Sequence, residues 1–169
     1  MNEPKVIAVE TLNQAAFAPF GKVLSLPSNP PTGEGKNHKY WSDLVELPRG
    51  NTSIGILQVD RNSEPIEMLE AHTEPEMLIC GEKPVIIVVA GPGDMNDPNS
   101  QPKTEEAMAF LMQPGQGVRY VVGAWHSLPI PLGGNGLCIF IVNPGMKGHG
   151  NTDEHWAKFE DGKTIIVRN

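Results

Sequence analysis

The chain has 169 residues, enough for one domain with a sizeable core, and we expect a single domain over residues 1–169. Its 20 Asp and Glu residues outnumber 13 Lys and Arg residues, and the basic residues form no block, so nucleic acid is not an expected partner. No stretch approaches the roughly 20 apolar residues of a membrane span. The first stretch, MNEPKVIAVE, lacks a signal-peptide pattern, so we expect a cytoplasmic protein with no membrane attachment.

The many turn-forming residues, 18 Gly and 16 Pro, divide the chain into short pieces, which favours an all-β fold. Lys5–Val9 is predicted to be an edge strand. Thr11 is predicted to cap a short helix that Pro19 and Gly21 end, and a second strand is expected over residues 22–26.

The next segment, residues 27–36, is rich in Pro, Gly, Ser and Asn and has no periodicity. We expect it to be a loop that is mobile or contacts another subunit. The stretch SIGILQVD alternates in character, which predicts a strand over Ser53–Asp60 with Ile54, Ile56 and Gln58 on one face.

Residues 67–90 (EMLEAHTEPEMLICGEKPVIIVVA) are predicted to form a hairpin around which the chain folds. Its two strand-like ends, MLEAH and PVIIVVA, flank a polar turn that carries His72, Glu74 and Glu76. The second end is a nearly continuous β-branched run of the kind that a buried strand needs. We expect residues 120–126 to pack against this hairpin.

The second half of the chain also divides into short apolar pieces. Residues 107–112 fit helix or strand, and we favour a strand that pairs with residues 118–122, because the turn PGQG separates them. Further along, we expect an edge segment, a tight hairpin loop (GGNG), an apolar strand, a short helix and a final strand, at residues 127–132, 133–136, 137–142, 153–159 and 164–168. Roughly eight to ten short strands predict a barrel or a double-sheet roll.

The cysteines of the chain, Cys80 and Cys138, each lie inside an apolar run, which predicts buried free thiols rather than a disulfide or a metal site. Three other residues are candidates for a metal site. His72 and Glu76 are four residues apart, so a regular strand would place both on one face, and His126 follows in the segment GAWHSLP. Two His and one Glu suffice for a divalent metal with open positions for substrate.

A single His is more often a structural residue held by hydrogen bonds, but these three residues at strand ends favour a functional site. Arg119 and Tyr120 alternate on one strand, so only one of them faces the pocket, and an inward Arg119 would bind a carboxylate. Trp125 is more often a core residue than a stacking platform. We interpret His38, His149 and His155 as surface residues, and the chain has no nucleophile elbow or phosphate-binding loop.

The segments AFAPFGKVL, MLEAH, PVIIVVA and PGQGVRYVVGAWHSLPI together resemble the ureidoglycolate lyase family, and GQGV, Tyr and WH followed by Pro are the most specific part. The resemblance implies a cupin-like barrel and cleavage of (S)-ureidoglycolate to glyoxylate and urea in purine (allantoin) breakdown by a homodimer. The reaction is the acid–base collapse of a hemiaminal. The pocket residues that it implies are His72, Tyr120, Trp125 and His126.

The chain departs from the family pattern at four positions. It has Glu76 where the family has Gln, Val121 where it has His, Gln58 where it has Arg, and Ser42 where it has His. The general cupin pattern HxH…E is also incomplete, because Glu70 stands in the place of its first His. Several functions therefore stay open: the family's lyase reaction, a metal-dependent cupin enzyme that acts on another small carboxylic acid, or a non-catalytic binding module.

In the lyase hypothesis, His72 and His126 are the acid and base in an order left open, and Tyr120 donates a proton or orients the substrate. Arg119 or Lys39 anchors the carboxylate of the substrate. Gln58 and Trp125 are further candidate substrate contacts. In the metal hypothesis, a nickel, manganese or zinc ion is held by three residues, His72, Glu76 and His126.

Overall fold

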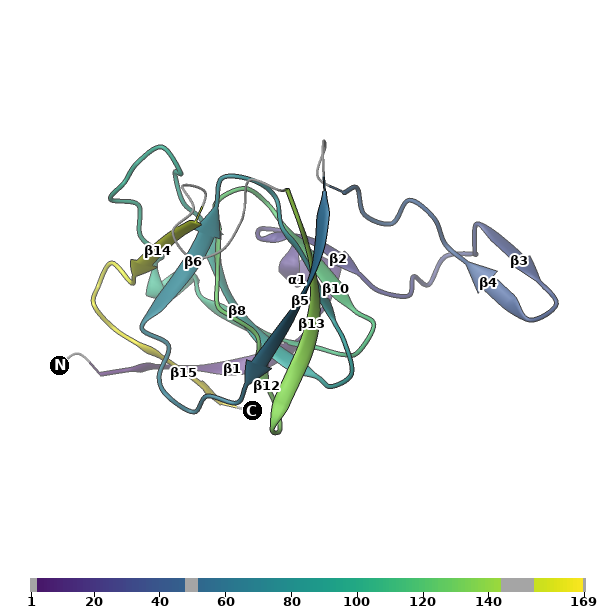
Figure 1. The fold of residues 1–169 in the computed structure, drawn as a ribbon. Coiled ribbons are helices and arrows are strands. Elements are labelled where there is room, and N and C mark those ends of the chain that lie inside the picture. The colour runs from purple at the N-terminus through teal and green to yellow at the C-terminus, as the bar shows by residue number, and fades with distance from the viewer. Residues whose placement is uncertain (1–2, 48–51, 144–153, 169) are drawn as a thin grey trace.

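The computed structural model describes residues 3–47, 52–143 and 154–168, and Figure 1 shows that they form almost entirely β-structure. The strands are β1 (Lys5–Thr11), β2 (Gly21–Leu24), β3 (Gly33–Gly35), β4 (His38–Tyr40), β5 (Ser53–Asp60), β6 (Met68–His72), β7 (Met77–Cys80), β8 (Val85–Pro92), β9 (Met108–Met112), β10 (Gly117–Tyr120), β11 (Ala124–His126), β12 (Ile130–Pro131), β13 (Asn135–Val142), β14 (Glu154–Lys158) and β15 (Ile165–Arg168). The helical pieces are α1 (Gln14–Phe17) and the 3-10 turn η1 (Thr104–Glu106).

Two curved sheets face each other. The larger sheet has the order β14-β6-β11-β8-β9-β1-β15, with β12 also paired to β8, and the smaller has the order β2-β10-β7-β13-β5. Together they enclose a half-barrel (Figure 1). The predicted all-β, cupin-like roll is confirmed.

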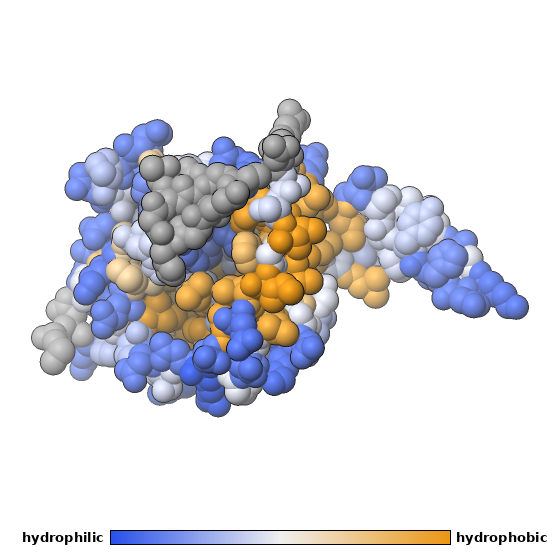
Figure 2. All heavy atoms as spheres, in the orientation of Figure 1, coloured by the Kyte–Doolittle hydropathy of each residue, from blue (hydrophilic) through white to orange (hydrophobic). Residues whose placement is uncertain are grey.

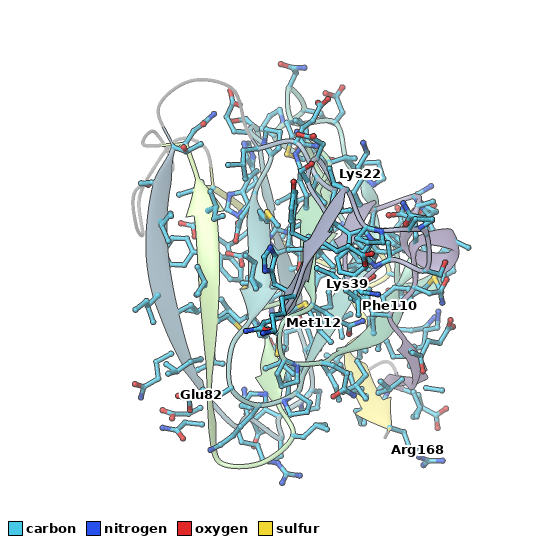
Figure 3. The ribbon with its side chains drawn as sticks, turned by 90° about the vertical axis from the view of Figure 1, so that its right-hand side faces the viewer. Lys22, Lys39, Glu82, Phe110, Met112 and Arg168 are labelled. Carbon is cyan, nitrogen blue, oxygen red and sulfur yellow. The ribbon has the colours of Figure 1, made fainter. Side chains whose placement is uncertain are left out.

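Strand β8 explains why the sequence carries an unbroken apolar run. Its alternate residues Val85, Ile87 and Val89 belong to the core between the sheets, where Phe110 and Met112 also lie (both labelled in Figure 3). The residues between them, Ile86, Val88 and Ala90, belong to a second core on the outer side of the larger sheet. A strand that is covered on both faces needs apolar side chains at every position.

Helix α1 begins two residues later than predicted. Asn13 is its N-cap and accepts a hydrogen bond from the Ala16 amide at 3.0 Å, whereas Thr11 still belongs to β1. Phe17, at the end of the helix, is fully buried and packs against the ring of Tyr120 at 6.1 Å between centroids. The helix therefore supports a residue of the candidate site.

The predicted hairpin over residues 67–90 is wrong, because this segment forms three strands. β6 and β8 lie in the larger sheet with β11 between them, and β7 lies in the smaller sheet. The predicted partner of residues 107–112 is also wrong, since β9 pairs with β8 and β1, whereas β10 pairs with β2 and β7. The GGNG loop carries the chain from one sheet to the other, from β12 to β13, and is not a hairpin loop.

Other predicted elements are confirmed or corrected individually. β5 matches its prediction over Ser53–Asp60, and residues 107–112 form a strand as expected. β1 is an internal strand of the larger sheet, not the predicted edge strand. The helix predicted near residue 155 is strand β14, because pairing with β6 decides the secondary structure of so short a segment. Residue 153 and His149 lie outside the described residues. No helix in the described ranges is long and apolar enough to cross a membrane.

Residues 25–47, which we call the arm, connect the two opposite edge strands of the smaller sheet, β2 and β5. The arm projects away from the half-barrel (Figure 1). Part of the predicted loop is ordered here as strand β3, which pairs with β4. The hairpin β3–β4 pairs with no other strand in the described part of the chain.

Candidate functional site

Two segments that are far apart in the sequence meet at one place in the half-barrel, as the sequence predicted. The first is the end of β6 with the turn after it, and the second runs from β10 to β11. The Tyr120 amide donates to the Glu76 carbonyl at 2.9 Å, and the Gly123 amide donates to the His72 carbonyl at 2.9 Å. These backbone bonds fix the two segments against each other.

Strand alternation decides which side chains enter the half-barrel. Leu69 and Ala71 of β6 belong to the outer core, so Glu70 and His72 point to the inside. In the same way, Trp125 packs in the outer core and His126 points inward, where it stands opposite Glu70 in the register. Glu70, His72, Glu76, Tyr120 and His126 form the group that we call the His/Glu cluster.

The side chains of the His/Glu cluster are almost fully enclosed and close together. His72 Nε2 lies 3.0 Å from Glu76 Oε2, which is hydrogen-bond distance. His126 Nε2 lies between two carboxylates, 3.6 Å from Glu70 Oε1 and 3.8 Å from Glu76 Oε2. Both of the latter distances exceed a normal hydrogen bond, so the three side chains leave room for a small ligand atom between them.

The ring of His126 is held from two sides. Its Nδ1 lies 2.9 Å from the Ala124 carbonyl, which fixes the proton of a neutral ring on Nδ1. The ring of Tyr120 stacks on it, with centroids 4.1 Å apart. His126 Nε2 and the Tyr120 hydroxyl are buried and have no hydrogen-bond partner among the described residues. Orphaned polar atoms of this kind point to a ligand.

Glu70, His72 and His126 fit a divalent metal ion. Each offers one ligand atom, and these atoms all lie within 4.8 Å of one another. Two imidazoles and one carboxylate suit nickel, manganese, iron or zinc, and a carbonyl that orients the ring of a ligating His is a common support. The sequence predicted Glu76 as the third ligand. Glu70 was not among the predicted site residues, although its i, i+2 spacing from His72 on a strand places both side chains on one face.

Burial and charge set the ionisation of the His/Glu cluster. Burial acts to raise the pKa of Glu76, but the nearby rings of His126 and His72 outweigh it and lower this pKa to about 2. Burial raises the pKa of Glu70. For His126, burial acts to lower the pKa, and the carboxylates of Glu76 and Glu70 overcome it and raise the pKa. Burial raises the pKa of Tyr120 well above its ordinary value, so this phenol is a proton donor at neutral pH.

A cavity of about 610 Å³ is lined by chain neighbours of the His/Glu cluster, although none of the five cluster residues lines it. Ser127 and Leu128, which follow His126, line it, and so does Trp156, the register partner of Glu70. Its lining also includes three acidic residues and, among the described residues, no Lys or Arg. The acidic residues are Asp60, Glu64 and Glu67.

The remaining predicted site residues lie away from the His/Glu cluster. Arg119 alternates with the inward Tyr120 and therefore lies on the outer face of the smaller sheet, in register with Lys22 and Met77. Trp125 fills the outer core. Gln58 is exposed on β5 and borders the cavity. Lys39 is exposed on the arm (Figure 3).

Comparisons with known proteins show which family the chain belongs to. A family model described as ureidoglycolate lyase matches residues 4–163. The chain is similar to the ureidoglycolate lyase of Azotobacter vinelandii, with 30% identity over 97% of this chain and 99% of the relative. It is also similar to the ureidoglycolate lyase of Pseudomonas fluorescens strain Pf0-1, with 30% identity over 96% of this chain and 98% of the relative. The chain belongs to the ureidoglycolate lyase family.

Proposed function

We propose that this chain is a lyase that cleaves (S)-ureidoglycolate to glyoxylate and urea, in the cytoplasm and in purine breakdown. The observation that carries the proposal is the buried His/Glu cluster with its orphaned His126 Nε2 and Tyr120 hydroxyl, in a chain of this family. Both atoms are buried and have no partner among the described residues, so both are available to a bound substrate.

The reaction is a proton-coupled bond cleavage without oxidation or reduction. A base takes the proton of the substrate hydroxyl, and the electron pair of that O–H bond forms the carbonyl of glyoxylate. The C–N bond breaks, and an acid protonates the departing nitrogen to give urea. The enzyme therefore needs one base, one acid and a group that holds the substrate carboxylate.

The protonation and contacts of the cluster residues indicate which of them serves as acid and which as base. Tyr120 keeps its proton because burial raises its pKa, so we assign it to donate a hydrogen bond or the proton to the leaving nitrogen. His72 and Glu76, joined at 3.0 Å, form the pair that receives the hydroxyl proton. His126 holds its place through Ala124 and presents Nε2 to the reacting group.

The same residues support a bound divalent metal, with nickel, manganese and zinc as candidates. Glu70, His72 and His126 would hold it, and its positive charge would polarise the substrate oxygens. Glu76, 3.0 Å from His72 in this structure, would stay outside that set of three ligands.

The test is an initial-rate assay of glyoxylate release from (S)-ureidoglycolate, with and without added Ni²⁺ or Mn²⁺. We expect activity well above the buffer rate, and a loss of about 100-fold or more in Glu70→Gln. Glu67→Gln is the matched control, because Glu67 is an exposed acid of the neighbouring cavity, and it should keep its activity. A wild-type rate equal to that of buffer under every metal condition rejects the proposal.

We further propose that the chain acts as a homodimer. β5 is an edge strand of the smaller sheet, and its outward side chains Ile54 and Ile56 are 74% and 75% exposed. They stand in register with Ile141 and Ile139 of β13, and Figure 2 shows apolar surface over these two strands. An apolar face of this kind on an edge strand is typical of a surface that a second copy covers. Sedimentation or light scattering at micromolar concentration measures the mass directly.

A further inference from the structure

Strand β14 brings one more carboxylate to the inner face of the half-barrel. It is an edge strand of the larger sheet and pairs with β6, beside which it lies in Figure 1. Glu154 stands directly opposite His72 in this register. Side chains of directly opposite residues share one face of a sheet, so Glu154 points inward with His72. The next residue, His155, stands opposite Ala71 of the outer core and points to the other side.

Glu154 lies within reach of the His/Glu cluster. Directly opposite residues of an antiparallel pair have Cβ atoms about 5 Å apart, and diagonal neighbours are about 7–8 Å apart. His72 is the direct neighbour of Glu154, and Glu70 is its diagonal neighbour, because the residue opposite Glu70 is Trp156. Burial is the main cause that raises the pKa of Glu70, and the negative charge of Glu154 acts in the same direction. The two carboxylates are therefore close enough to interact.

The half-buried carboxylate of Glu154 has open acceptor positions. No hydrogen bond or ion pair joins it to another residue in the described part of the chain. By contrast, Glu76 contacts His72 at 3.0 Å, and Glu70 faces His126 at 3.6 Å. Glu154 is also not one of the three residues whose ligand atoms lie within 4.8 Å of one another. A carboxylate in this situation is suited to bind the N–H donors of a ligand.

We propose that Glu154 accepts hydrogen bonds from the ureido group of the substrate and makes the site specific for that group. This role rests on the lyase function proposed above and concerns the recognition of one end of its substrate. On the side away from its oxygen, a ureido group presents two parallel N–H donors, one from each nitrogen. This pair of donors matches the two oxygens of a carboxylate, as a guanidinium group does.

The position of Glu154 suits the reaction. His72 lies directly opposite, so a ureido group on Glu154 places its C–N bond beside the pair of His72 and Glu76 that receives the hydroxyl proton. In the substrate, the hydroxyl and the leaving nitrogen are bonded to the same carbon. The contact with Glu154 is made in the bound substrate as well as in the transition state, so its loss should raise KM more than it lowers kcat.

Two unreactive substrate analogues test the contact. N-carbamoylglycine keeps the ureido group and the carboxylate of the substrate, and N-acetylglycine has a methyl group in place of the terminal NH₂. We expect the inhibition constant of N-carbamoylglycine for wild-type glyoxylate release to be at least about 10-fold lower than that of N-acetylglycine. In Glu154→Ala the difference should shrink to about 2-fold or less, and KM for (S)-ureidoglycolate should rise by about 10-fold.

Matched variants separate recognition from a structural effect. Glu154→Gln keeps the size of the side chain but has a single acceptor oxygen and no charge, so it should also lose most of the preference. It takes the place of Glu154→Ala if that variant does not fold. His155→Ala changes the same strand on its outer side and should keep both the preference and KM.

The outcomes distinguish this role from the proposed function. Glyoxylate release by the wild type is measured first, and its absence rejects the lyase function and the role of Glu154 with it. In an active enzyme, a wild type that does not prefer N-carbamoylglycine, or Glu154 variants that keep the preference, overturn the role of Glu154 alone. An affinity for Mn²⁺ that both Glu154 variants weaken by more than about 10-fold would make Glu154 a metal ligand and would also overturn it.

Discussion

The rings of Tyr120 and His126 lie almost parallel, with 10° between their planes and 4.1 Å between their centroids. Tyr120 ends β10 of the smaller sheet and His126 ends β11 of the larger sheet, so this stack joins the two sheets at the site. The phenol also packs against Phe17 of α1. The helix, both sheets and the site therefore share one contact, which keeps the tyrosine hydroxyl in a fixed position beside the histidine.

Tyr120→Phe should separate the chemical role of this residue from its structural one. The variant keeps the stacked ring and removes a buried hydroxyl that has no hydrogen-bond partner among the described residues, so the free energy of unfolding should change by less than about 1 kcal/mol. Loss of a proton donor should lower kcat by about 100-fold. Steady-state kinetics and urea unfolding measure the two effects, and an unchanged kcat would remove Tyr120 from the mechanism.

Metal affinity should distinguish the ligand set of the structure from the one that the sequence predicted. Titration calorimetry with Mn²⁺ should give an affinity that Glu70→Gln weakens by more than about 10-fold, because a direct ligand is lost. Glu76→Gln is the matched variant and should weaken it less. The reverse order of the two variants would show that Glu76 is the ligand.

Gly21→Ala should damage the site from a distance. The backbone of Gly21 has a φ of +153°, and a Cβ there would overlap the Arg119 carbonyl oxygen, next to Tyr120. β2 must move away from β10 to accept it, at a cost of about 2–4 kcal/mol in the free energy of unfolding. Gly133→Ala is the control, because nothing lies within 4 Å of its Cβ. Equal stability of the two variants in urea unfolding would contradict this account of the β2–β10 contact.

The turn that precedes β15 should make stability depend on pH. Hydrogen bonds from Thr104 and Lys163 lower the pKa of Asp161 from 3.8 to about 2. Because the pKa is lower in the folded state, the carboxylate stabilises the protein above pH 3.8, and this contribution disappears as the pH falls toward 2. Asp161→Asn should therefore be less stable than wild type at pH 6 and should approach it near pH 2.5. A difference in unfolding free energy that stays constant between these two pH values would refute the assignment.

The sequence predicted which segments meet at the candidate site better than it predicted the strand connections around it. His72 and His126 were named because, with one Glu, they offer ligand-type side chains at strand ends, and the two segments that carry them do meet. Glu70 was not predicted as a site residue because the strand register, which decides what points inward, is set by pairing with β11 and is not encoded locally. The same reason made residues 67–90 look like a hairpin, although β11 separates β6 from β8.

Short elements were the other source of wrong secondary-structure predictions. β14 has five residues, and no periodicity distinguishes a helix from a strand at that length. Its pairing with β6 therefore decides that the segment is a strand. By contrast, β5 alternates over eight residues and was predicted with its correct bounds. Its alternation also predicted that Ile54, Ile56 and Gln58 share one face of the strand, and all three side chains are exposed in the structure.

The products released from (S)-ureidoglycolate test the central claim most directly. Purified wild-type protein, with Mn²⁺ or Ni²⁺ supplied, should release glyoxylate and urea in equal amounts, at a rate at least about 100-fold above buffer, and should release no ammonia. Acid–base collapse of the hemiaminal leaves the ureido group intact, which is why urea must appear. Ammonia in place of urea, or glyoxylate formed no faster than in buffer, would contradict the lyase assignment.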